Sequence, residues 1–117
     1  MVNYMNLDQT LTALAHPVRR DVLAQLLQGE APVKELAVFR RISGPALTKH
    51  LHILERAGLI TRSRIGQQRP CRLRMEPMQE LDEWMEMYRQ FWAESFDRLD
   101  EHLKATQTKA KKKARKR

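Results

Sequence analysis

The chain has 117 residues and a formal net charge of +8. Its length and its 42% of hydrophobic residues are typical of one soluble domain with a single hydrophobic core. It contains no apolar run long enough to cross a membrane, no signal-peptide pattern, and too few cysteines, a single one, for an internal disulfide. We therefore expect a cytoplasmic protein without a membrane partner.

Two helices are predicted in the N-terminal third. The first has an apolar face of Leu7, Leu11, Leu14 and Ala15. His16 is interpreted as a helix-boundary residue, and Pro17 can open the next helix because proline is tolerated in a first turn. That helix ends at Gly29, and its core side is predicted to consist of Val18, Val22, Leu23, Leu26 and Leu27.

Residues 32–39 and 43–57 are predicted to be two short helices, joined by residues 40–42. In the second helix, Ser43 is a suitable N-cap, and Gly58 is a residue of the kind that commonly ends a helix. Its buried side is predicted from leucines spaced by four and three residues, namely Leu47, Leu51 and Leu54. Two short helices with so short a connection indicate a helix-turn-helix.

Residues 59–65 and 69–75 are predicted to be two strands joined by a turn at 66–68. A hairpin that follows a recognition helix is a wing. Pro70 has no backbone N–H, so the returning strand should lie at a sheet edge or pair only on its other side there.

A long helix is predicted from Pro77 to about Leu103, which gives a mainly α fold with a small β-hairpin wing (α+β). Its apolar stripe covers roughly 140°, broader than a surface helix of a small domain needs, and favours a partner chain. The alternative is that these side chains cover their own core or line an apolar ligand pocket. The predicted dimer interface comprises Leu7, Leu11, Leu81, Trp84, Met85, Tyr88, Phe91, Trp92, Phe96, Leu99 and Leu103.

The positive charge is unevenly distributed. Eight of the 22 Lys and Arg side chains lie in residues 104–117, which contain no acid, so the other 14 equal the 14 Asp and Glu. Within 1–103, however, residues 40–74 hold nine Lys or Arg and only one acid, Glu55. This concentration on the helix-turn-helix and wing is typical of phosphate binding.

The chain is accordingly divided into a DNA-binding and dimerisation domain, 1–103, and a basic tail, 104–117. The tail has too few apolar groups for a core and is predicted to be disordered. It would either add salt-sensitive, non-specific DNA affinity or serve only as a solubilising end.

Three blocks of the sequence resemble signatures of the ArsR (ArsR/SmtB-like) bacterial winged-helix repressors: Leu14 to Leu23, Val33 to Ala37, and Ser43 to Gly58. The resemblance implies a homodimer that represses transcription and is released by an inducer. The expected partners are double-stranded DNA, a second copy of the chain and, if the protein responds to one, a small-molecule inducer.

Base reading is assigned to Thr48, Lys49 and His52, and phosphate contact to Ser43 and Arg41. For His52 the alternative is a solvated side chain. Gly44 departs from the resemblance, because relatives commonly carry a polar side chain there. The wing should supply further contacts, although a solvated hairpin is a serious alternative for its glutamines. The candidate wing residues are Arg62, Arg64, Gln67, Gln68 and Arg69.

No metal and no cofactor are expected. Where metal-sensing members of the family have Cys-Val-Cys, this chain has Ala37-Val38-Phe39, and Asp100-Glu101-His102 is half of another ligand pattern. An incomplete ligand set binds metal poorly. Cys71, flanked by arginines, is either a redox-sensitive thiol or, as we favour, a small packing residue.

The sequence shows no nucleophile elbow, phosphate loop or convergent carboxylate pair, so an enzyme is not expected. Two other functions remain open. One is a winged-helix module that binds another protein, and the other is an architectural protein that binds DNA without regard to sequence.

Overall fold

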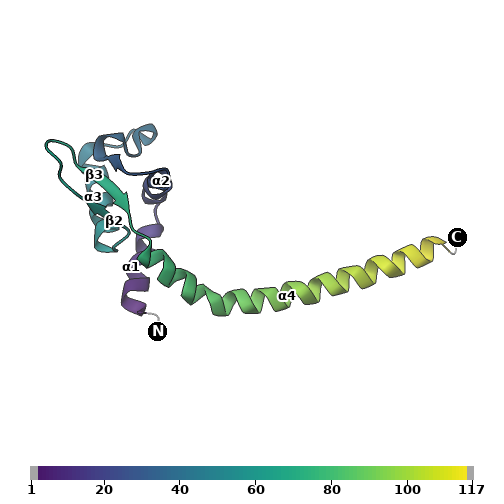
Figure 1. The fold of residues 1–117 in the computed structure, drawn as a ribbon. Helices are drawn as coiled ribbons and strands as arrows, with labels where there is room; N and C mark the ends of the chain where they lie inside the picture. Colours follow the sequence, from purple (N-terminus) through teal and green to yellow (C-terminus); the bar gives the residue numbers. More distant parts are fainter. Residues whose placement is uncertain (1–2, 116–117) are drawn as a thin grey trace. The chain divides into compact units, whose positions relative to one another are not determined.

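The structure is a computed structural model that describes residues 3–115 and comprises two compact units, Met1–Asp82 and Glu83–Arg117 (Figure 1). The four helices are α1 (Tyr4–Leu14), α2 (Pro17–Leu26), α3 (Gly44–Arg56) and α4 (Glu76–Arg115). The remaining elements are β1 (Ala31–Pro32), β2 (Ile60–Arg62), β3 (Pro70–Leu73) and two 3-10 helices, η1 (Val33–Glu35) and η2 (Val38–Arg40). The predicted class is confirmed: a mainly helical winged helix-turn-helix with a small sheet and a long C-terminal helix.

Side-chain caps fix where the first three helices begin. Asn3 accepts hydrogen bonds from the N–H groups of Met5 and Asn6 at 3.1 and 3.3 Å. The ring of His16 accepts from Val18 N at 3.1 Å, directly before Pro17. Ser43 Oγ accepts from Ala46 N at 3.2 Å. These bonds satisfy N–H groups that a helix leaves without partners, and they confirm the predicted boundary roles of His16 and Ser43.

The core lies where α2 and α3 meet the sheet. Leu47, Leu51 and Leu54 of α3 are buried as predicted, with exposures of 9%, 0% and 0%. The predicted core side of α2 is also buried, except for Leu27, which is 67% exposed and follows the last residue of the helix. The sheet and the turn before it complete the core with Leu36, Ala37, Leu59, Ile60 and Cys71.

The prediction of a single helix at residues 32–39 is wrong. The segment forms η1 and η2 instead, separated at Ala37, whose φ of +52° is left-handed. Gln25 of α2 binds this break, because its Nε2 donates to Glu35 O at 2.7 Å and its Oε1 accepts from Ala37 N at 3.0 Å. These bonds from another element replace the i to i−4 bonds that would have continued a helix.

The sheet is antiparallel in the order β1-β3-β2, so β3 is central and not an edge strand. The other predicted outcome is confirmed, because among the described residues Pro70 is paired in the ladders with Pro32 of β1 alone. Pro70 costs no bond to β1, because its carbonyl, and with it the position of the missing N–H, points away from Pro32 and toward β2. On that side, Ser63 N donates to Pro70 O at 3.1 Å, but proline cannot return the bond. The β2–β3 ladder accordingly ends at the Arg62–Cys71 pair.

Helix α4 continues to Arg115, which differs from the disordered tail predicted from residue 104; residues 116 and 117 lie outside the described part. A helix can propagate without a core when its residues favour it, and the tail is rich in Ala, Lys and Arg and lacks Gly and Pro. Lys104 pairs with Asp100 one turn earlier at 3.0 Å, which links the tail to the preceding turn.

Candidate nucleic-acid interface

The exposed side of α3 carries the residues predicted to read DNA. Gly44, Thr48, Lys49 and His52 are all exposed, opposite the buried leucines. Ser43 and Arg41 are exposed just before the helix. Arg41 has a φ of +52°, so the chain turns sharply at the point where it enters α3.

The wing, residues 59–75, reverses direction in a loop that projects beyond β2 and β3 (Figure 1). Ile65 and Gln68 exchange two backbone hydrogen bonds of 3.0 Å, and Gly66 adopts a φ of +61°, which glycine does at little cost. Exposed side chains at this end of the wing are Arg64, Gln67, Gln68 and Arg69.

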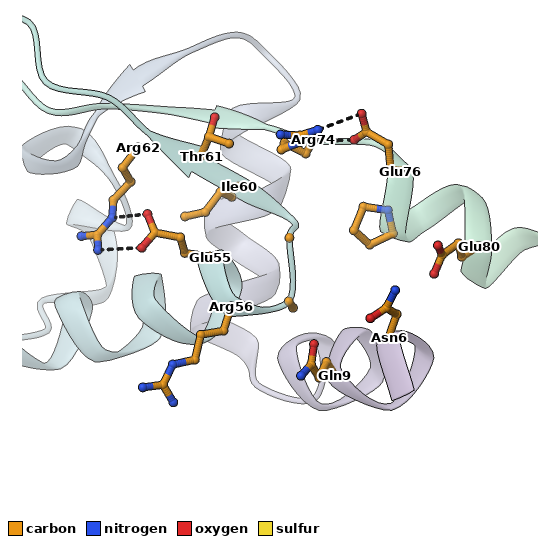
Figure 2. Close-up of a pocket in the computed structure, with 13 residues that line it drawn as sticks. Asn6, Gln9, Glu55, Arg56, Ile60, Thr61, Arg62, Arg74, Glu76 and Glu80 are labelled. Atoms are coloured by element: carbon orange, nitrogen blue, oxygen red, sulfur yellow. Dashed lines mark hydrogen bonds and ion pairs between the residues drawn. The ribbon is translucent and has the colours of Figure 1, made fainter. Parts of the chain in front are cut away.

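Arg62 differs from the other predicted contacts because it is held within the protein. Its Nε and Nη2 donate to the two carboxylate oxygens of Glu55 at 3.0 and 3.2 Å (Figure 2). Its Nη2 also lies 3.2 Å from Nδ1 of His52, and its side chain is only 17% exposed. The hydrogen bond from Arg62 lowers the pKa of Glu55. Arg62 therefore joins the wing to α3, and it does not belong to the exposed set.

Two other arginines of the basic region are paired with acids. Arg40 pairs with Asp21 of α2, and Arg74 pairs with Glu76 at 3.2 Å. The formal charge of residues 40–74 consequently overstates the positive charge available to phosphates. Within the described part of this region six exposed cations remain: Arg41 before α3, Lys49 and Arg56 on α3, and Arg64, Arg69 and Arg72 on the wing.

The anchoring of α3 by Arg19 was missed from the sequence. Arg19 Nε and Nη2 donate to the carbonyl oxygens of Ala13 and Thr12 at 2.7 and 2.9 Å, in the last turn of α1. Its Nη1 lies 3.2 Å from Nδ1 of His50 on α3. The buried arginine thus joins three helices, and the only sequence signal was the adjacent pair Arg19-Arg20 after a helix break.

Cys71 is fully buried in β3, and burial raises the pKa of its thiol. A thiol of this kind reacts slowly, because the thiolate is the reactive form. The structure supports the packing interpretation over the redox one.

The predicted dimer residues fall into three groups. Leu7 is 3% exposed within its own chain and offers a partner almost no surface. Leu81, Trp84 and Met85 are half-buried. The exposed group lies mostly along α4, with exposures from 40% to 66%, and comprises Leu11, Tyr88, Phe91, Trp92, Phe96, Leu99 and Leu103.

A cavity of about 480 Å³ lies beside the Glu55–Arg62 pair, bordered by α1 and the first turn of α4 (Figure 2). Its lining mixes amides, carboxylates and guanidinium groups, including Asn6, Arg74 and Glu80. Among the described residues no group of three or more His, Cys, Asp or Glu side chains is placed to hold a metal. In the same part of the chain, no helix is both long and apolar enough to cross a membrane.

The exposed face of α3, the adjoining wing and the anchored core define a winged helix-turn-helix protein, and comparison with known proteins agrees. A family model described as a helix-turn-helix domain matches residues 14–63. The HTH-type transcriptional repressor SmtB of Mycobacterium tuberculosis is 37% identical over 60 residues, which are 51% of this chain and 44% of that protein. The chain thus spans less than half the length of this curated relative.

Solved structures extend the likeness over most of the chain. The crystal structure of an ArsR family transcriptional regulator is 35% identical, with a TM-score of 0.73, over 80% of this chain and 97% of the other. A homodimeric winged helix-turn-helix DNA-binding domain from Mycobacterium bovis, 23% identical with a TM-score of 0.59, shares the fold over 78% of this chain and 84% of its own. The protein belongs to the ArsR family of transcriptional regulators.

Proposed function

We propose that this family member is a homodimeric, sequence-specific DNA-binding repressor that binds a palindromic operator through α3 and the wing. The observation that carries the proposal is the two-sided character of α3. Its leucine side is buried, while Thr48, Lys49 and His52 are exposed beside a wing with exposed arginines. A helix held in this way can enter a major groove without losing its core contacts.

The residue roles follow from these positions. Thr48, Lys49 and His52 would contact base edges, and Ser43 and Arg41 would contact phosphates. Gly44 has open space around it and no side chain, so it would let the DNA approach the first turn of α3 closely. The wing would add contacts from Arg64, Gln67, Gln68 and Arg69, whereas Arg62 acts inside the protein.

A second copy of the chain is the proposed occupant of the apolar stripe on α4. Large side chains such as Phe96, at 66% exposure, are costly to leave in water over so long a stripe. A two-fold dimer would present two α3 helices to half-sites about one turn of DNA apart. Repression is proposed from the relatives, since SmtB of M. tuberculosis is a transcriptional repressor.

Binding to the DNA upstream of the protein's own gene, compared with scrambled DNA across a salt series, tests the proposal. The full chain should prefer its own upstream DNA. Lys49→Ala should reduce specific binding more than non-specific binding. Lys109→Ala, at an exposed position of the tail, is the control. It should weaken binding to both DNAs equally and reduce the dependence of affinity on salt concentration.

Failure to discriminate the two DNAs would contradict the regulator proposal. If affinity then depended only on salt and on the basic tail, a sequence-blind architectural protein would explain the data better. If no DNA were bound, the protein-interaction module would take its place.

A further inference from the structure

The hydrogen bond between Arg62 and His52 determines which ring nitrogen of His52 carries the proton. A guanidinium group has only donors, and Arg62 Nη2 lies 3.2 Å from His52 Nδ1. Nδ1 must therefore accept, and the proton of the neutral ring lies on Nε2. His52 is exposed on α3, so its remaining nitrogen is a donor available outside the protein.

Glu55 holds Arg62 in the place where this bond can form. Both carboxylate oxygens of Glu55 accept from the guanidinium, which fixes its plane. The Arg62 backbone is paired with buried Cys71 in the sheet. Glu55 and His52 lie three residues apart on α3, hence on neighbouring positions of one helix side. A single guanidinium thus connects the wing with a DNA-facing side chain.

We infer that Glu55 and Arg62 are positioning residues that hold His52 as an Nε2–H donor for base reading. The inference rests on the proposed function, because it assigns specificity within the same interface. A group that only donates selects a base edge that accepts. Guanine presents two acceptors in the major groove, O6 and N7, whereas adenine and thymine present one each, N7 and O4, and cytosine presents an amino donor. We therefore expect His52 to favour guanine at one position of each half-site.

The tautomer can be measured without DNA. Long-range proton–nitrogen NMR spectra of the full chain at pH about 8, above the ordinary His pKa of about 6.5, distinguish the two neutral tautomers. The wild-type His52 ring should be Nε2–H, and Arg62→Met should give a mixture of tautomers. Arg64→Met, which removes an exposed arginine from the same wing, is the matched control and should leave His52 unchanged.

The base preference is measured by selecting binding sites from a library randomised in the half-sites. His52→Ala should lower the preference for guanine at one position by about fivefold to tenfold, the lower range for a lost base contact. Arg62→Met should lower the preference at that same position. Arg64→Met should weaken binding to all sequences about equally. Glu55→Gln, which is nearly isosteric, gives a second test if Arg62→Met folds poorly.

The outcomes separate this inference from the proposed function. If wild-type protein selects a specific site but His52 is Nδ1–H, or if neither Arg62→Met nor Glu55→Gln changes the guanine position, the inference is wrong and the regulator stands. If wild-type protein selects no site, both fail, even when the tautomer is as expected.

Discussion

Arg19 donates a 2.7 Å hydrogen bond to the carbonyl oxygen of Ala13. A side chain of α2 thus supplies a donor to the C-terminal end of α1. The last carbonyls of a helix have no partners within that helix. Arg19 also binds Thr12 O, and Arg20 binds Leu14 O at 2.8 Å. Three successive carbonyls of α1 are therefore satisfied by two adjacent arginines, and the positive charges lie where the helix dipole favours them.

Replacing Arg19 with Met should destabilise the protein by about 2–4 kcal/mol, because buried carbonyls lose charged donors. Arg20→Met is the control, because Arg20 is exposed and water can replace its bond; the cost should stay below about 1 kcal/mol. Urea denaturation of both variants measures the difference. Equal decreases in the free energy of unfolding would show that the buried Arg19 contributes no more to stability than the exposed Arg20.

His50 should make stability depend on pH. Burial, followed by the charges of His16 and Arg19, lowers its pKa in the folded protein below the ordinary histidine value of about 6.5. Between the two pKa values the unfolded chain binds more protons, so stability is full above about pH 6.5 and decreases as pH falls below it. Glu55 does not interfere, since its pKa is lowered below the ordinary glutamate value and it titrates only at a more acidic pH than the two compared.

Denaturation midpoints at pH 7.5 and pH 5.5 test this expectation. His50→Gln should reduce the loss of stability between the two pH values, whereas His102→Gln, at an exposed position, should leave the loss as in the wild type. A His50→Gln variant with the wild-type pH dependence would contradict the assignment.

Local signals in the sequence were sufficient for α3 but not for the segment before it. The cap at Ser43 and the leucine spacing both act within a few residues, so the pattern alone locates the helix. The break at Ala37 depends on Gln25, twelve residues earlier, and no local pattern contains that bond. The same reason explains Arg62, whose role is decided by Glu55 and not by its position in a basic strand.

The helix in residues 104–115 differs from the prediction for the tail for another reason. A composition argument tests whether a segment can form a core, and residues 104–117 cannot. Helix formation from an existing helix needs only favourable propensities, which Ala and Lys supply. The exposed side of α3 and the α4 stripe were predictable because each follows from the helical period. Their partners lie outside the chain, so roles at these sites remain proposals.

The thiol of Cys71 should be protected in the native protein. Because it is fully buried and its pKa is raised, a thiol reagent should react at least about 100-fold more slowly than in denaturant, as expected when access requires unfolding. Ser63→Cys in a Cys71→Ala background places a thiol at an exposed wing position and is the control. Comparable native rates at the two positions would revive the redox interpretation.

Substitution by alanine should lower the stability of the protein at Gly58 but not at Gly44. Gly58 ends α3 with a φ of +74°, so Gly58→Ala should cost about 1–2 kcal/mol of stability. Gly44 lies in the first turn of α3, where an added Cβ meets nothing within 4 Å. Alanine gains helix propensity there but meets the restriction that Pro45 places on the residue before it, so Gly44→Ala should change stability by less than about 0.5 kcal/mol. Thermal unfolding of the two variants compares them, and a stabilised Gly58→Ala would contradict the strain argument.

The apolar stripe on α4 should determine the oligomeric state. Phe96→Glu places a charge within the stripe, and a buried unpaired charge weakens association strongly. We expect the dimer to dissociate at micromolar concentration, as measured by sedimentation velocity. Gln90→Glu adds the same charge about 120° from Phe96 around the helix, opposite the middle of the stripe, and should leave the dimer intact. A Phe96→Glu protein that remains dimeric, or a wild-type protein that is monomeric, would show that the stripe does not hold a second copy.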